Sequence, residues 1–427
     1  MKIHITHGRV IDPITQRDSQ SDLFIAAGKI VALERCPAGF TPNRVIDARG
    51  KIVMPGLVDL AARLREPGYE YLATLESEMV AATVGGVTSL SCPPDTDPPL
   101  DEPGLVEMLK HRAHGREQTN VYPLGALTQQ LQGLRLTEMG ELYDAGCIAF
   151  SQANAPLLDT QVLLRALDYA TTFGFTVWLQ PQDAYLARDG VAHDGEVASR
   201  LGLPAIPTCA ETIALNTILQ LVRETGARVH LCRLSSASGV DLVREAKREG
   251  LPVTCDVSIN HLHLTEHDIG YFNAHCRLIP PLRSVRDRAA LRAGLVDGTI
   301  DALVSDHAPV DVDAKQLPFE AAEPGATGLE LLLPLTLAWA RSEALPLITA
   351  LARITSAPAK ILGIPAGQLS PGQPADLCIF DPEREWVVTP KNLKSQGKNT
   401  PFLNHLMLGK VSHTLVGGFI IHEDARA

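Results

Sequence analysis

The stretch that decides the fold of this chain reads Pro55-Gly56-Leu57-Val58-Asp59-Leu60-Ala61-Ala62-Arg63-Leu64-Arg65-Glu66-Pro67-Gly68. Its apolar first half, 55–61, predicts a buried strand. Residues two apart on a strand point to the same face, so Ala61 and Arg63 would lie side by side at its end. Ala carries no donor atom, and Arg stays protonated and repels a cation. The end of this strand is therefore unsuited to binding a metal ion.

The middle of the chain alternates short apolar strands with amphipathic helices. Several of the helical patterns end at Gly, a frequent helix stop. Eight buried parallel strands separated by helices predict a (β/α)₈ barrel of the TIM type, whose functional groups lie at the C-terminal ends of the strands. The strand candidates are 55–61, 87–92, 120–126, 147–151, 176–180, 228–234, 252–257 and 300–306, and the clearest helices are 159–174, 211–226, 239–250 and 285–298.

Both ends of the chain are rich in short strands and turns. This pattern predicts a smaller composite β-sandwich domain built from both termini, so that the fold class is α/β. We place the barrel at residues 55–359 and the β-domain at residues 1–54 and 360–427. The predicted terminal strands are 2–10, 23–26, 29–33 and 45–47, then 375–381, 385–388, 409–416 and 419–422.

Composition narrows the class of partner and the compartment. The formal net charge of -11 argues against nucleic acid and against an anionic membrane surface. No apolar run approaches the roughly 18 residues of a transmembrane helix, and the N-terminus has no signal-peptide pattern. The eight Cys residues form no Cys-x-x-Cys pair, which favours reduced cysteines in a cytoplasmic protein.

Several motifs, in this order, resemble those of the dihydroorotase family of the long bacterial type over nearly the whole chain. This resemblance implies a metal-dependent amidohydrolase ancestor, which hydrolysed or closed a cyclic amide with metal-activated water. Besides 55–68, the matching pieces are Cys92-Pro93-Pro94-Asp95, Phe150-Ser151, Leu201-Gly202-Leu203-Pro204, Pro280-Pro281-Leu282-Arg283, Thr299-Ile300-Asp301-Ala302 and Ser305-Asp306-His307-Ala308-Pro309.

The family's metal ligands are replaced at nearly every matching position. The resemblance implies a His pair on the first strand, a carboxylated Lys or Asp after the fourth, a His on each of the fifth and sixth, and an Asp after the eighth. Only the last of these remains, so we expect no metal, no cofactor and no catalytic residue beyond a vestigial Asp306. The former ligand positions are Ala61, Arg63, Ala153, Gln180, Arg233 and Asp306.

The substrate contacts implied by the resemblance are depleted as well. Arg65 keeps the position that would hold a substrate carboxylate. Asp95 and Val310 replace an Asn and a His that would assist it, and Ile279 replaces a further Asn. Arg65 is therefore the one candidate for substrate binding, and a structural pairing with Glu66 or with a loop is the stronger expectation.

Asp306 and one pair of histidines can each be interpreted as structural or as functional residues. A lone buried carboxylate needs a cation, so we expect Asp306 to pair with Arg63 or Arg233. His261 and His263 form a His-x-His pair near the barrel mouth that could hold a metal, although hydrogen-bonded loop histidines are the default.

Three functions remain open. The resemblance favours a non-catalytic dihydroorotase-like subunit, a pseudoenzyme that acts as a structural scaffold for the catalytic chain of aspartate transcarbamoylase in pyrimidine biosynthesis. In that case we expect a homo-oligomer within a larger complex. The alternatives are an active dihydroorotase or other cyclic amidohydrolase with a rebuilt metal site, and a ureide-binding regulatory protein.

Overall fold

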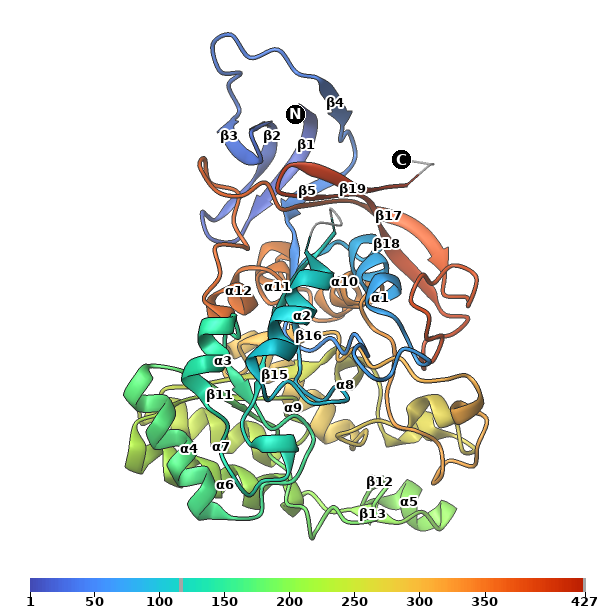
Figure 1. Cartoon of the computed structure of the whole chain (residues 1–427). Coiled ribbons are helices and arrows are strands. Elements are labelled where there is room, and N and C mark those ends of the chain that lie inside the picture. The colour runs from blue at the N-terminus through green and yellow to red at the C-terminus, as the bar shows by residue number, and fades with distance from the viewer. Residues whose placement is uncertain (115–117, 425–427) are drawn as a thin grey trace.

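The computed structural model describes residues 1–114 and 118–424, and the barrel and the terminal β-domain are both present (Figure 1). Within these residues, eight parallel strands form the barrel, which confirms the predicted fold class. They are β6 (Leu57–Asp59), β7 (Val87–Cys92), β8 (Asn120–Pro123) continued by β9 (Gly125–Ala126), β10 (Phe150–Ser151), β11 (Thr176–Leu179), β14 (Arg228–Leu231), β15 (Val253–Ser258) and β16 (Ala302–Val304).

Backbone hydrogen bonds close these strands into a ring. Strands β9, β10, β11, β14, β15 and β16 form one parallel sheet, and β6, β7 and β8 form another. The two sheets first meet at residues 120–126. There Leu124 N donates to Cys92 O on one side, and Gly125 N donates to Ala149 O on the other, both at 2.9 Å. The second join lies beyond β6 and β16, where His307 N donates to Ala61 O and Arg63 N donates to His307 O, also at 2.9 Å. The backbone contact that closes the barrel therefore involves Ala61 and Arg63, two residues of the predicted site.

The helices of the barrel follow the strands and pack outside them (Figure 1). Three predicted helices, α4, α6 and α9, end at Gly residues in the left-handed conformation, as the pattern indicated. The helices are α1 (Leu75–Val84), α2 (Pro103–Ala113), α3 (Met139–Ala145), α4 (Thr160–Phe173), α5 (Glu196–Leu201), α6 (Cys209–Thr225), α7 (Ala237–Arg248), α8 (Ile259–His263), α9 (Val285–Asp297), α10 (Leu332–Ser342), α11 (Leu347–Ala352) and α12 (Ser356–Leu362).

Short elements fill the loops around the barrel mouth. Strands β12 (Ala192–His193) and β13 (Ala205–Ile206) pair with each other. The 3₁₀ turns are η1 (Gln129–Leu131), η2 (Glu266–Ile269), η3 (Ala274–Cys276) and η4 (Asp313–Lys315). No helix in the described ranges is long and apolar enough to cross a membrane.

The terminal strands form one hydrogen-bonded sheet with strands from both ends, in the order β19-β18-β17-β5-β1-β2-β3, with β4 on β1. Strand β5 joins the two ends, because its Val53 pairs with Val10 on one side and Ile379 on the other. The strands are β1 (Lys2–Asp12), β2 (Arg17–Ala26), β3 (Lys29–Leu33), β4 (Arg44–Asp47), β5 (Ile52–Pro55), β17 (Leu377–Val387), β18 (Leu406–Val416) and β19 (Phe419–Glu423).

The predicted strand 55–61 is wrong in its extent. Pro55 ends β5 in the terminal sheet, and the barrel strand β6 covers only residues 57–59. Gly56 separates the two, and its N–H donates to Asp376 O at 2.9 Å. A Cβ atom at Gly56 would lie 2.1 Å from the side chain of Thr88, so no larger residue fits this crossing. The exact domain boundaries stay a prediction.

Candidate functional site

Arg63 lies four residues after the end of β6, and its side chain is almost fully buried against Asp95. Its Nε donates to Asp95 Oδ2 at 2.8 Å, and the side chain of Arg63 is 7% exposed. Burial opposes the charge of Arg63, but Asp95 and Asp306 outweigh this effect and raise its pKa. Burial likewise opposes the charge of Asp95, and the neighbouring guanidinium of Arg63 keeps the pKa of that carboxyl below its usual value. Both groups are therefore held as ions by each other.

Arg233, which follows β14, is the centre of the site. Its Nη1 lies 3.2 Å from Asp306 Oδ1, and the two side chains are 6% and 7% exposed. Its Nη2 donates to Asn154 Oδ1 at 2.5 Å and also to Gln180 Oε1. One guanidinium thus holds together side chains that follow four strands, β10, β11, β14 and β16. This confirms the predicted pairing of Asp306 with an arginine.

Four residues at this site share an uncommon backbone conformation. Arg65, Ala153, Arg233 and Asp306 all have positive φ values, of 63°, 51°, 55° and 50°. Such a conformation is uncommon for residues other than Gly, and it concentrates at functional sites. Three of the four stand at positions where the family resemblance implies a metal ligand. The main chain therefore adopts an uncommon conformation at three of these positions, although Asp306 alone among them offers a metal-ligating side chain.

These residues do not fit a divalent metal. A metal site of this kind needs His nitrogens and carboxylate oxygens. Of the six former ligand positions, Asp306 alone offers a carboxylate, and it already pairs with Arg233. A fixed guanidinium in the centre of the site repels a cation and fills the space near its remaining ligand. No catalytic step through a metal follows from this arrangement.

A second group of possible ligands lies beneath Arg233. Within the described residues, His230, Cys232 and Asp256 are the one set of His, Cys, Asp and Glu ligand atoms close enough to share an ion. Both ring nitrogens of His230 are already hydrogen-bonded, to Thr254 Oγ1 at 2.8 Å and to Asp256 Oδ2 at 2.9 Å. The other oxygen of Asp256 accepts the backbone N–H of Arg233 at 2.7 Å. This set therefore supports the backbone of Arg233.

The alternative metal pair, His261 and His263, is not arranged as a chelate. Both lie on helix α8, where residues two apart point in different directions. His261 Nε2 contacts Pro281 O at 3.2 Å, and His263 Nε2 contacts Leu335 O at 3.0 Å. Burial lowers the pKa of His263 to about 4. The sequence suggested a loop or strand end here, and the short helix separates the two rings.

Arg65 pairs with a loop, as expected, and not with Glu66. Its Nε donates to Pro309 O at 2.9 Å, while Glu66 forms an ion pair with Arg112. Burial and the charge of Arg63 lower the pKa of Arg65. A cavity of about 160 Å³ lies in front of these groups. Its lining includes Arg63, Arg65, Asp95, Asn154, Arg233, Leu278, Ile279, Asp306, Ala308, Glu323, Pro324 and Gly325.

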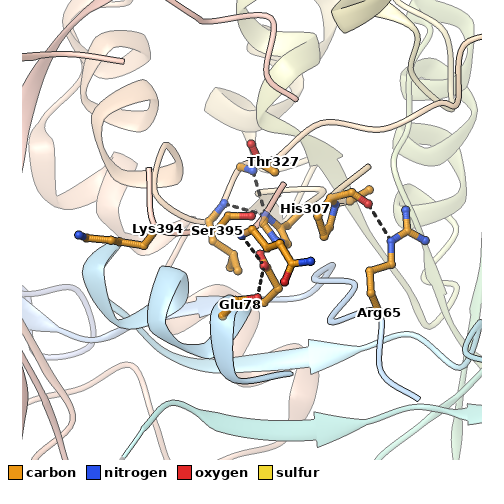
Figure 2. A network of polar contacts seen from close by, with 12 residues as sticks. Arg65, Glu78, His307, Thr327, Lys394 and Ser395 are labelled. Carbon is orange, nitrogen blue, oxygen red and sulfur yellow. Dashed lines mark hydrogen bonds and ion pairs between the residues drawn. The ribbon is translucent and has the colours of Figure 1, made fainter. Parts of the chain in front are cut away.

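A network behind the site was missed by the sequence reasoning (Figure 2). His307 and Glu78 are both completely buried, and His307 Nε2 lies 2.7 Å from Glu78 Oε2. Because His307 Nδ1 accepts the backbone N–H of Gly328 at 3.1 Å, the Nε2 proton points to Glu78. Glu78 Oε1 also accepts the N–H of Gln396 at 2.9 Å. The sequence offered one signal of this network, which is Glu78, a carboxylate within the apolar helical pattern of α1.

Comparisons with known families agree with the motifs. The sequence model described as Dihydro-orotase-like matches residues 50–238, and that of the Amidohydrolase family matches residues 188–422. The chain is 46% identical to the "Dihydroorotase-like protein" of Pseudomonas aeruginosa over 99% of this chain and 100% of that protein. It is 41% identical to the "Dihydroorotase" of Syntrophus aciditrophicus over the same shares of the two chains.

Solved structures agree on the architecture. The L-hydantoinase (dihydropyrimidinase) of Arthrobacter aurescens superposes with a TM-score of 0.87 at 25% identity, covering 99% of this chain and 96% of that one. A D-hydantoinase structure, at 21% identity and a TM-score of 0.84, shares the fold. With the barrel, the motifs and two relatives above 40% identity, this chain belongs to the dihydroorotase-like family of the amidohydrolase superfamily.

Proposed function

We propose that this chain is a non-catalytic dihydroorotase-like subunit that acts as a structural scaffold for aspartate transcarbamoylase in the cytoplasm. The contact between Arg233 and Asp306 carries this proposal. It places a fixed cation beside Asp306, the one carboxylate at the positions where the resemblance implies a metal ligand, and this cation disfavours a metal that would activate water. The family frame is nevertheless kept over nearly the whole chain, which supports a role that depends on shape and surface.

Reconstitution with the partner tests the scaffold directly. The full chain and the catalytic chain of aspartate transcarbamoylase from the same organism are purified, mixed and measured for mass in solution and for transcarbamoylase activity. We expect one stable complex that contains several copies of each chain, with at least about 1,000 Å² buried at a specific contact. A transcarbamoylase that assembles and works equally well without this chain would refute the scaffold.

The cavity in front of Arg65 supports a second candidate, a ureide-binding regulatory protein. Three guanidinium groups line the cavity, but three carboxylates, those of Asp95, Asp306 and Glu323, balance their charge. This balance weakens any attraction for a substrate carboxylate, so we rank the scaffold first. Titration with dihydroorotate or carbamoyl aspartate tests the binder.

One variant separates the two candidates. Arg65→Gln removes a guanidinium from the cavity and leaves a shorter, uncharged polar side chain. A scaffold should assemble with this variant as it does with the unchanged chain, whereas a ureide binder should lose affinity. The remaining alternative, an active cyclic amidohydrolase with a rebuilt metal site, requires stoichiometric zinc in the purified protein.

A further inference from the structure

A polar recess lies in the terminal β-domain, apart from the cavity at the barrel mouth. It has a volume of about 550 Å³, within the range of small-ligand sites. It is formed by the end of β17, by the connection from β17 to β18, by β18 and by Asp424 after β19, on the orange-to-red part of the ribbon in Figure 1. We name it the basic groove, and its lining is Arg384, Glu385, Trp386, Val387, Lys391, Asn392, Lys394, Lys410 and Asp424.

The basic groove carries a net positive charge, which is opposite in sign to that of the whole chain. Four of its lining side chains are cationic and two are carboxylates, which leaves an excess of two positive charges. The whole chain has a formal net charge of -11. A local cluster of one sign inside a recess concentrates the field there and attracts ions of the opposite sign. The groove is therefore a place where this acidic protein can hold an anion.

The cations of the groove are only partly neutralised by the protein. Arg384 Nη1 lies 3.0 Å from Asp424 Oδ2, and the Lys410 ammonium lies 4.3 Å from the centre of the Trp386 ring. Lys391 and Lys394 are exposed, and among the described residues neither ammonium group makes an ion pair or hydrogen bond. Two exposed cations thus line the recess without an ion-pair partner among residues 1–114 and 118–424.

The innermost cation, Lys410, lies close to other positive charges. Burial lowers the pKa of Lys410, and the charges of Arg384 and Lys394 lower it further, while Glu330 and Asp424 act in the opposite direction. Burial of the Lys410 ammonium therefore costs free energy in the empty groove. An anion bound beside it would offset part of this cost and favour the charged form of Lys410.

We propose that the basic groove binds a compact polyanion that carries at least two phosphate groups. Lysines act as point charges toward phosphate, and three of them around one recess suit a ligand whose charges are closely spaced. An acidic peptide fits less well, because Trp386 and Val387 are the groove's only large apolar lining residues. Inorganic polyphosphate and the phosphate chain of a nucleotide share this chemistry.

Ligand binding in the groove would also reach the network behind the barrel site. The groove residue Lys394 and its neighbour Ser395 donate backbone N–H groups to Glu330, at 2.8 Å and 3.1 Å. The next residue, Gln396, donates to Glu78, which holds His307. A ligand that fixes Lys394 therefore steadies the segment that backs His307, and we expect slower hydrogen exchange at these backbone amides.

Calorimetric titration of the full chain with sodium tripolyphosphate at low ionic strength tests the proposal. We expect one saturable site, and at least about a tenfold loss of affinity, or about 1.4 kcal/mol, in the double variant Lys391→Gln/Lys394→Gln. Both lysines are exposed, so the fold should be unaffected. The matched control is Lys360→Gln, an exposed lysine on α12 outside the groove, and its affinity should equal that of the unchanged chain.

Further ligands identify the source of the phosphates. Binding of a nucleoside triphosphate more tightly than tripolyphosphate supports the proposal with a nucleotide as the ligand, and equal binding supports it with the phosphate chain alone. Absence of heat with tripolyphosphate at about 1 mM, or equal weakening by Lys360→Gln, overturns it. Tighter binding of polyglutamate than of tripolyphosphate also overturns it, in favour of an acidic protein segment.

Discussion

Arg233 and Asp306 form a buried ion pair, with Nη1 and Oδ1 3.2 Å apart, at the point where the barrel would otherwise hold a metal. Removing one partner of a buried pair costs about 3–5 kcal/mol, because the other charge is left uncompensated. The pair therefore couples the arrangement of this site to the stability of the fold.

The first prediction measures this coupling by denaturant unfolding. Arg233→Met should lower the free energy of unfolding by about 3 kcal/mol, because Asp306 loses its nearest cation. Adding Asp306→Asn should recover part of the loss, since Asn is uncharged and tolerates the positive φ of 50°. The control Arg248→Met breaks an exposed pair with Glu245 and should change stability by less than about 1 kcal/mol. Equal losses in the single and double variants would show that the two charges are not coupled.

The second prediction concerns restored metal ligands. The double variant Ala61→His/Arg63→His rebuilds the His pair of the first strand, but Gln180 and Arg233 still occupy two ligand positions. Cyclisation of carbamoyl aspartate, assayed with added zinc, should be absent in the unchanged chain and in this variant. The dihydroorotase of Syntrophus aciditrophicus serves as the positive control. Turnover by either form of this chain would contradict the non-catalytic assignment.

The third prediction is an acid dependence of stability that comes from Glu78. Burial opposes its ionisation, but the hydrogen bond and charge of His307 and the hydrogen bonds from Ser395 and Gln396 together outweigh burial and lower the pKa of Glu78. A carboxyl whose pKa is lower in the folded state stabilises the protein above its unfolded pKa of about 4.3, and this contribution is lost as the pH falls through the folded value. Urea midpoints measured from pH 7 to about pH 3 should therefore fall less steeply in Glu78→Gln. The exposed control Glu383→Gln should follow the unchanged chain, and a parallel fall in all three proteins would exclude Glu78 as the source.

The fourth prediction concerns the cysteines, all eight of which are free thiols in the structure. Cys36 and Cys209 are exposed, and the others are buried or partly buried. Burial raises the pKa of Cys92 to about 12, so its reactive thiolate is suppressed. A thiol reagent should modify two groups rapidly in the folded protein and all eight after unfolding. Fewer than eight in the unfolded, unreduced protein would indicate a disulfide.

The sequence by itself determined the barrel and predicted that the residues at its mouth do not suit a metal. Alternation of apolar strands with Gly-terminated helices predicts the architecture, because each pattern reports which face of an element is buried. The replacements at Arg63, Gln180 and Arg233 are equally local, since a guanidinium or an amide cannot serve as a His ligand in any surrounding structure. The expected pairing of Asp306 with an arginine rested on the cost of burying a lone charge, which holds wherever the partner comes from.

Only the tertiary structure decided which arginine pairs with which carboxylate, and what lies behind them. Arg63 takes Asp95 and Arg233 takes Asp306, because the strand register and the positive φ at Arg233 direct the two guanidinium groups to different partners. The contact of His307 with Glu78 joins residues 229 positions apart, and the basic groove joins residues on β17, β18 and the connection between them. Contacts of this kind depend on how distant elements pack, and no local pattern of residues encodes them.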